Sequence, residues 1–196
     1  MRVVVSEFMS LDGVVQAPGG PEEDTSGGFQ HGGWWHQFHD PEIGAKVIGA
    51  LPDTCEALLQ GRVTYQVSKT AWPERGGDPF SDWINRTQKY VVSDTLTEAD
   101  LTWNPTTLIR PADLIETVSA LRQKPGGDIY VYGSMTLVRS LLVAGQVDEL
   151  ILMLGPITLG GGKNLFPADG VARKFELISA ETASTGAQVC RYRPIS

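Results

Sequence analysis

Residues 127–142 read Gly-Asp-Ile-Tyr-Val-Tyr-Gly-Ser-Met-Thr-Leu-Val-Arg-Ser-Leu-Leu, and residues 147–155 read Val-Asp-Glu-Leu-Ile-Leu-Met-Leu-Gly. The first apolar run, at 129–132, is short and β-prone, and the glycine after it lets the chain turn directly into a helix. Apolar residues then recur at helical spacing: Leu137, Val138, Leu141 and Leu142. A second apolar run at 150–154 indicates another buried strand, so this stretch predicts a strand, a helix and a parallel strand.

The turn at Gly133-Ser134 allows two interpretations. The first N–H groups of a helix have no partner within the helix, and together with the helix dipole they suit a phosphate group. The same turn also serves an ordinary strand-helix-strand unit that binds nothing. From this stretch alone, both interpretations stay open.

Composition argues against several classes of protein. With 196 residues, of which 41% are apolar, the chain is long enough for one domain over 1–196 with a large core. Its formal net charge of −7 and its lack of a Lys/Arg cluster argue against a nucleic-acid partner. No apolar run approaches the roughly 18 residues that span a bilayer, and the start lacks a secretory segment. We therefore expect a cytoplasmic protein with no membrane partner, in which Cys55 and Cys190 are reduced core residues.

The rest of the chain alternates between strand and helix patterns. Further strands are predicted at 2–9, 57–59, 89–93, 174–179 and 187–192, and further helices at 41–51, from 61, at 79–87 and from 111. Residues 16–33 are rich in glycine, proline and acidic residues, which predicts an irregular loop that is either a functional lid or a disordered excursion. Alternating elements that end in a hairpin predict an α/β fold with a mostly parallel sheet and an antiparallel edge.

Small or hydroxyl residues occupy three predicted strand-to-helix junctions, at 61–64, 93–95 and 133–136. In an open α/β sheet, ligands bind at the carboxyl ends of the strands. Arg62 adds a guanidinium suited to a phosphomonoester such as the 2′-phosphate that distinguishes NADP from NAD. Arg62 could equally be a solvated surface arginine, and Thr64 could simply satisfy the backbone of the first helical turn.

Other nucleotide and metal motifs fit poorly. The loop at 155–164 suggests a Walker motif, but Ile157 replaces its first glycine and Asn164 replaces the Ser or Thr that binds magnesium. No Gly-x-Gly-x-x-Gly follows a strand, which argues against a Rossmann fold. His36 and His39 have the spacing of a metal pair, but no cysteine or carboxylate joins them in a recognised ligand pattern, so no metal site is predicted. Their aromatic surroundings indicate a pocket wall or a subunit contact.

Six motifs occur together in one order along the chain. They are Ser-Leu-Asp-Gly-Val at 10–14, Leu-Leu-Gln-Gly-Arg-Val-Thr-Tyr at 58–65, Lys-Tyr-Val-Val-Ser at 89–93, Val-Tyr-Gly-Ser at 131–134, and Val-Asp-Glu-Leu at 147–150 with Gly-Gly-Gly-Lys at 160–163. As a set they resemble the dihydrofolate-reductase-like family, which includes the reductase domain of the bifunctional riboflavin-biosynthesis deaminase-reductase. The resemblance covers nearly the whole chain and is closest to the small stand-alone members.

This resemblance implies a three-layer α/β/α fold, NADP(H) as cofactor, and a homodimer with the C-terminal strands in contact. It places the cofactor at the three junctions, on Gly61, Arg62, Thr64, Ser93, Gly133, Ser134, Met135 and Thr136. Asp12 falls beside the nicotinamide and substrate, as the candidate catalytic residue. Trp34, His36 and Gly161 are the candidate substrate-binding residues.

Two departures from the family narrow the expected activity. Dihydrofolate reductases proper carry an acidic residue on the helix after the first loop, and Asp40 and Glu42 provide no clean match here, so folate reduction is not expected. The chain begins directly at the reductase-like strand, so deamination is not expected either.

The leading hypothesis is an NADPH-dependent reductase that transfers a hydride to a small heterocyclic substrate, pterin- or pyrimidinone-like. Asp12 is its candidate proton manager or substrate anchor, because a carboxylate at a partly dry strand end can have a raised pKa. Asp12 could also be an ordinary Asp-Gly turn residue. The alternative hypothesis is a non-catalytic dimeric module that binds or senses NADP(H).

Overall fold

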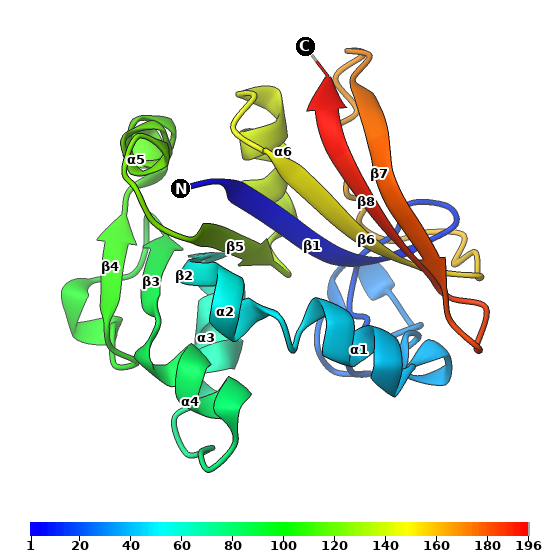
Figure 1. Cartoon of the computed structure of the whole chain (residues 1–196), viewed down its shortest axis with the longest axis horizontal. Coiled ribbons are helices and arrows are strands. Elements are labelled where there is room, and N and C mark those ends of the chain that lie inside the picture. The colour runs from blue at the N-terminus through cyan, green and yellow to red at the C-terminus, as the bar shows by residue number, and fades with distance from the viewer. Residues whose placement is uncertain (196) are drawn as a thin grey trace.

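One eight-stranded sheet organises the protein, and the computed structural model in Figure 1 describes residues 1–195. The strands are β1 (Val3–Ser10), β2 (Cys55–Gly61), β3 (Gln88–Val92), β4 (Thr106–Ile109), β5 (Asp128–Tyr132), β6 (Glu149–Gly155), β7 (Lys174–Thr182) and β8 (Gln188–Ile195). The α-helices are α1 (Pro41–Val47), α2 (Leu51–Thr54), α3 (Arg62–Ala71), α4 (Pro79–Arg86), α5 (Leu114–Arg122) and α6 (Met135–Val143). Short 3₁₀ turns are η1 (Ser26–Gly28), η2 (His36–Phe38), η3 (Glu98–Asp100) and η4 (Pro111–Asp113).

The strands lie in the order β4-β3-β2-β5-β1-β6-β8-β7. The first six are parallel, β8 runs antiparallel to β6, and β7 runs antiparallel to β8. The stretch at 127–155 forms β5, α6 and β6, and β1 is inserted between its two strands. The predicted mostly parallel sheet with an antiparallel C-terminal hairpin is therefore confirmed.

Helices cover both faces of the sheet and make the three predicted layers (Figure 1). On one face, α5 and α6 contribute Val118 and Leu141 to a core that also holds Val3 and Val5 of β1. On the other face, helices α1 to α4 pack against Val4 and its neighbours. Because β1 is covered on both sides, its first three residues, Val3 to Val5, are all apolar and buried.

One predicted element differs from that observed, and one observed strand was not predicted. The helix expected at 41–51 is two helices, α1 and α2, because Pro52 lacks the N–H that a continuous helix would need and disfavours helical geometry just before it. Strand β4 was not predicted, since its four residues include two threonines and lack a long apolar run. Within residues 1–195, no helix is both long and apolar enough to cross a membrane.

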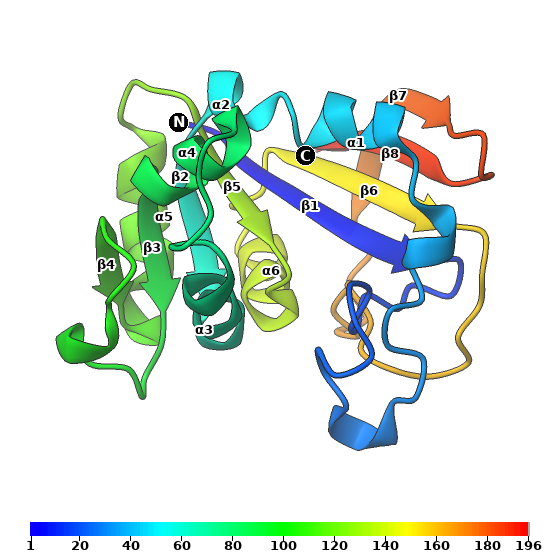
Figure 2. The ribbon, with the colours of Figure 1, turned by 90° about the horizontal axis from the view of Figure 1, so that it is seen from below.

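The central strand β1 is longer than one of its neighbours. It pairs with β5 only as far as Ser6, opposite Tyr132, but with β6 as far as Ser10, opposite Gly155. Figure 2 shows β1 and β6 running on together past the end of β5. The sheet therefore has a step at the carboxyl end of β5, and this step lies at the edge where the sequence predicts ligand binding.

Candidate functional site

The three predicted junctions lie at one edge of the sheet. In the register of neighbouring strands, Gly61 of β2 lies opposite Val92 of β3, and Leu59 lies opposite Val131 of β5. The residues after these strand ends, Ser93 and Gly133, therefore follow neighbouring positions on the same edge. The grouping expected from the sequence is present in the structure.

A chain of hydrogen bonds joins the first junction, at 61–64, to the third, at 133–136. The Gly61 N–H donates to Ser134 Oγ over 2.9 Å, and that hydroxyl donates to Thr64 Oγ1, also over 2.9 Å. Thr64 Oγ1 in turn donates to the Gly133 carbonyl over 2.9 Å. Gly133 has a φ of 64°, a left-handed conformation that favours glycine. These hydroxyls hold the starts of α3 and α6 side by side.

The helix starts themselves remain open at this edge. Neither Gly61 at the start of α3 nor Ser134 at the start of α6 provides a side-chain cap. The first N–H groups of both helices are thus available to an external acceptor, and both helix dipoles are positive here. Two adjacent helix N-termini of this kind suit two linked phosphate groups.

The second junction, at 93–95, contributes a tight turn that an arginine contacts. Ser93 Oγ accepts hydrogen bonds from the N–H groups of Thr95 and Leu96, at 3.1 and 3.0 Å, so it first stabilises its own loop. Arg110 donates through Nη1 to the carbonyls of Ser93 and Leu96, at 2.8 and 2.9 Å. Arg62 is exposed and donates to Gln66 Oε1 over 3.0 Å.

Arg110 was missed because it directly follows β4, which was missed as well. Its signal in the sequence is an arginine placed immediately after a Thr-Thr-Leu-Ile segment. Once β4 is known to be parallel to β3, that position falls at the same sheet edge as Ser93. The edge therefore carries two guanidinium groups rather than the single one expected.

The surroundings of Asp12 differ from those expected of a residue with a raised pKa. Its carboxylate accepts hydrogen bonds from Ser10 Oγ at 2.6 Å, from the Gly160 N–H at 2.8 Å and from the Leu159 N–H at 3.1 Å. These donors, the Ser10 hydroxyl above all, lower the pKa of Asp12 from its ordinary value. The raised pKa expected for this residue was wrong, because Asp12 is exposed and well supplied with donors. Asp12 instead joins the turn after β1 to residues 159–163, the glycine loop.

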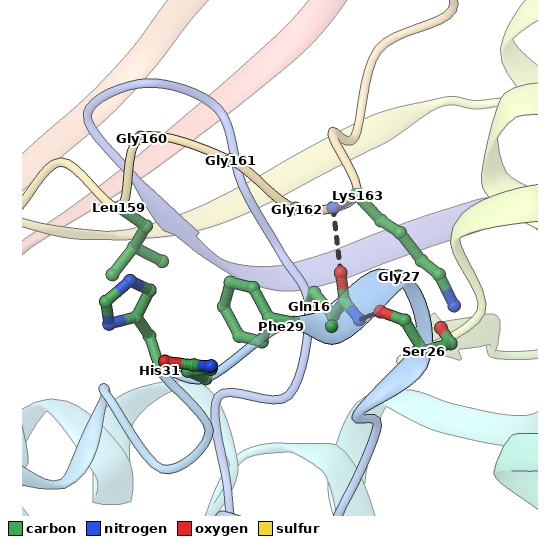
Figure 3. Close-up of a pocket in the computed structure, with 12 residues that line it drawn as sticks. Gln16, Ser26, Gly27, Phe29, His31, Leu159, Gly160, Gly161, Gly162 and Lys163 are labelled. Carbon is green, nitrogen blue, oxygen red and sulfur yellow. Dashed lines mark hydrogen bonds between the residues drawn. The ribbon is translucent and has the colours of Figure 1, made fainter.

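A pocket of about 540 Å³ opens between the 16–33 loop and the glycine loop (Figure 3). Residues 26–31 and 159–163 line it, together with Gln16. Gln16 is buried, donates through Nε2 to the carbonyls of Asp24 and Ser26, and accepts from the Lys163 N–H, each over 3.0 Å. The buried Gln16 side chain thus joins the two walls of the pocket by hydrogen bonds.

The three predicted substrate residues are not brought together by the pocket. Gly161 lines it, whereas Trp34 and His36 do not. Trp34 is buried and donates its indole N–H to the Gln16 carbonyl over 2.9 Å. Nε2 of His36 lies 2.8 Å from the Gly19 carbonyl. Both side chains hold the 16–33 loop in place, and His31, which was not predicted, lines the pocket.

Glu7 is a further residue that sequence reasoning missed. It lies in the middle of β1, is only 4% exposed, and its Oε1 has no hydrogen-bond partner among the described residues. Burial raises the pKa of Glu7 to about 8, partly offset by the backbone N–H groups of Gly133 and Ser134 and increased by the charge of Glu23. The available signal was a carboxylate in the middle of the strand predicted at 2–9, because charged residues are rarely buried without a partner.

Comparison with known proteins gives matches over almost the whole chain. The family model described as RibD C-terminal domain matches residues 1–189. Among curated proteins, Uncharacterized protein YyaP of Bacillus subtilis (strain 168) is similar, with 27% identity over 190 residues that cover 94% of this chain and 90% of the relative.

Three solved structures are similar in fold. A putative riboflavin biosynthesis protein from Shewanella sp. PV-4 has a TM-score of 0.73 and 20% identity, with all of both chains covered. The diaminohydroxyphosphoribosylaminopyrimidine deaminase/5-amino-6-(5-phosphoribosylamino)uracil reductase of Thermotoga maritima has a TM-score of 0.64 and 13% identity, over 99% of this chain and 56% of that one. Dihydrofolate reductase from Enterococcus faecalis, complexed with NADP(H), has a TM-score of 0.56 and 15% identity, over 100% of this chain and 97% of that one. These likenesses confirm the predicted dihydrofolate-reductase-like fold.

The bonds of Asp12 lead to a prediction that does not depend on activity. In Asp12→Ala, the amides of Leu159 and Gly160 lose their acceptor, and their hydrogen exchange becomes faster by roughly two- to twelvefold, because one hydrogen bond contributes about 0.5–1.5 kcal/mol. Hydrogen-deuterium exchange with peptide-level mass spectrometry measures this, with peptides from α5 as the internal control. Unchanged exchange at 159–160 would show that Asp12 does not hold the glycine loop.

Proposed function

The chain belongs to the family of RibD C-terminal domains, and on this premise we propose that it is an NADPH-dependent reductase acting on a small heterocyclic substrate, pterin- or pyrimidinone-like. The observation that carries the proposal is the pair of uncapped helix N-termini held side by side by Ser134 and Thr64. The NADP(H) bound to the structurally similar dihydrofolate reductase supports this choice of cofactor.

The residues present fit an anionic dinucleotide. Gly61 and Thr64 at α3, with Gly133 to Thr136 at α6, would hold the pyrophosphate through backbone N–H groups. Arg62 would hold the 2′-phosphate, and Ser93, with Arg110 behind it, would border the adenosine end. When bound, the nicotinamide supplies the hydride.

The chain's own residues would orient the substrate and exclude water from it. The pocket of about 540 Å³ has the size of a site for a small ligand, and Gly161 leaves one wall free of side chains. Asp12, ionised at neutral pH, would act as the substrate anchor through the glycine loop rather than as a proton donor. Trp34 and His36 would support the substrate indirectly, by fixing the 16–33 loop.

We also propose a cytoplasmic homodimer. Strand β7 ends the sheet, is nine residues long, and exposes Leu177 and Ile178 by 53% and 50%. A long strand at the side of a sheet has unpaired backbone groups that can pair with another chain. A second copy of this chain would therefore cover the free side of β7. The buried, unpaired thiols of Cys55 and Cys190 suit a reducing compartment.

Cofactor preference tests the assignment first. NADPH raises the melting temperature more than NADH does, and Arg62→Ala weakens NADPH binding by about tenfold, or about 1.4 kcal/mol, while NADH binding stays the same. Differential scanning fluorimetry and calorimetric titration measure both effects. Arg86→Ala serves as the control, because that exposed arginine ends α4, which precedes β3 and therefore lies at the opposite edge of the sheet. Equal stabilisation by both cofactors would refute the NADP(H) assignment.

Turnover separates the reductase from a binding or sensing module. With a panel of pterins, pyrimidinones and small carbonyls, we expect at least one compound to oxidise NADPH, followed by the absorbance of the reduced nicotinamide. The rate falls on the order of 10- to 100-fold in Asp12→Ala, with NADPH affinity retained, because a loosened glycine loop misplaces the substrate. NADPH binding without oxidation by any compound would favour the non-catalytic alternative.

The dimer prediction concerns β7. At micromolar concentration the protein should sediment at twice the chain mass of 21.2 kDa, and Ile178→Lys should shift it to a monomer, because a charge replaces an apolar contact. Analytical ultracentrifugation measures this. Val171→Lys is the matched control, since Val171 is 60% exposed in the loop before β7. A wild-type monomer, or an undisturbed dimer in Ile178→Lys, would remove β7 from the proposal.

A further inference from the structure

Glu7 lies where the sheet steps down from β1 to β5. Its neighbour Ser6 is the last β1 residue paired with β5, so Glu7 faces the turn that starts α6 on that side. On its other side it remains paired with Leu152 of β6. Counting from Val5 along the strand, the Glu7 side chain points to the face covered by α6. The carboxyl group is therefore placed beside the open helix N-terminus at 133–134.

The surroundings of Glu7 favour its neutral form. The strand residues on the same face, Val5 and Leu152, are buried and apolar. Glu23 of the 16–33 loop adds a negative charge, and within residues 1–195 Glu7 forms no ion pair. The N–H groups of Gly133 and Ser134 are the groups that favour ionisation. A buried carboxylate without a counterion is costly, so the group keeps its proton at neutral pH.

A neutral acid at this position is compatible with a phosphate, whereas a carboxylate is not. An ionised Glu7 would compete with an anionic ligand for the same N–H groups and would repel it through a poorly solvated region. A protonated Glu7 removes that repulsion and leaves Oε1, which has no partner in the described part of the chain, as an acceptor. Buried polar atoms normally have partners, so an open acceptor beside a ligand site indicates that the ligand supplies one.

Resting on the proposed function, we propose that Glu7 is a binding residue of the dinucleotide site that acts as a neutral carboxylic acid, accepting a hydrogen bond from a ribose hydroxyl or the carboxamide N–H of the cofactor. Binding of NADPH is then coupled to protonation of Glu7. By linkage, the bound cofactor strengthens the affinity of Glu7 for its proton as much as that proton strengthens the affinity for the cofactor.

The direction of the pH dependence follows from the raised pKa. The pKa of Glu7 is about 8, so at lower pH the group is neutral and the site can bind the cofactor. At higher pH the fraction of protein that can bind the cofactor falls. If only the neutral form binds, NADPH affinity at pH 9 is about tenfold weaker than at pH 7. At pH 8, binding takes up about half a proton per site. The 2′-phosphate of the cofactor titrates near pH 6, so it stays ionised throughout this range.

Calorimetric titration of NADPH at pH 8, in two buffers of different ionisation enthalpy, measures the proton uptake directly. Wild-type protein should take up about half a proton per site, and Glu7→Gln should take up none and show no loss of affinity between pH 7 and pH 9. Glu149→Gln is the matched control, because Glu149 is also buried in the sheet but pairs with Arg2 and Arg191, and its uptake should equal that of wild type.

A second variant keeps the test decisive if Glu7→Gln fails to fold. Burial is the main cause of the raised pKa of Glu7, and the charge of Glu23 adds to it, so in Glu23→Gln the proton uptake at pH 8 should fall below the wild-type value. Binding without proton uptake in wild type, uptake that persists in Glu7→Gln, or unchanged uptake in Glu23→Gln would each overturn the role of Glu7 while leaving the cofactor assignment intact. Absence of NADPH binding at both pH 7 and pH 8 would instead refute the proposed function, and this inference with it.

Discussion

Burial of β1 on both faces is the constraint on which the rest of the structure depends. As a central strand between β5 and β6, β1 must present apolar side chains to helices on either side, and Val3, Val4 and Val5 do so. Polar groups on such a strand need partners or must remain neutral. Ser10 has partners at its end of the strand, in Asp12 and the Val14 N–H, while Oε1 of Glu7 in the middle has none among residues 1–195. The candidate site begins where β1 extends past the end of β5 and is no longer paired on that side.

The step between β1 and β5 combines two kinds of chemistry at one edge. On the side of β2 and β5, short hydroxyl side chains join two helix starts and leave their N–H groups open, which favours a phosphate-bearing ligand. On the side of β1 and β6, the Asp12 carboxylate and the Gln16 amide hold two loops around a pocket. A reductase needs both regions, because one holds the hydride donor and the other its acceptor.

Glu7 and Asp12 show how environment separates two carboxylates of one strand and its turn. Asp12 is exposed and accepts hydrogen bonds from a hydroxyl and two backbone N–H groups, so its pKa is lowered. Glu7 is buried beside apolar neighbours, so its pKa is raised to about 8. Sequence reasoning chose Asp12 as the candidate proton manager or substrate anchor because a carboxylate at a partly dry strand end can have a raised pKa. Solvent exposure and the number of hydrogen-bond donors decide the protonation state, and neither is visible in the sequence.

The sequence by itself determined the α/β class, the parallel strand and helix pattern at 127–155, the C-terminal hairpin and the family resemblance, because hydrophobic periodicity and glycine turns are local properties. It also placed Gly61, Ser93 and Gly133 at strand ends, and parallel strands necessarily bring such ends to one edge. Only the tertiary structure decided that β1 extends past the end of β5 and that Arg110 lies at the same edge as Ser93. It also decided that Trp34 supports a loop instead of lining the pocket. Strand register, burial and the partners of each polar atom depend on residues distant in sequence, and no local pattern specifies them.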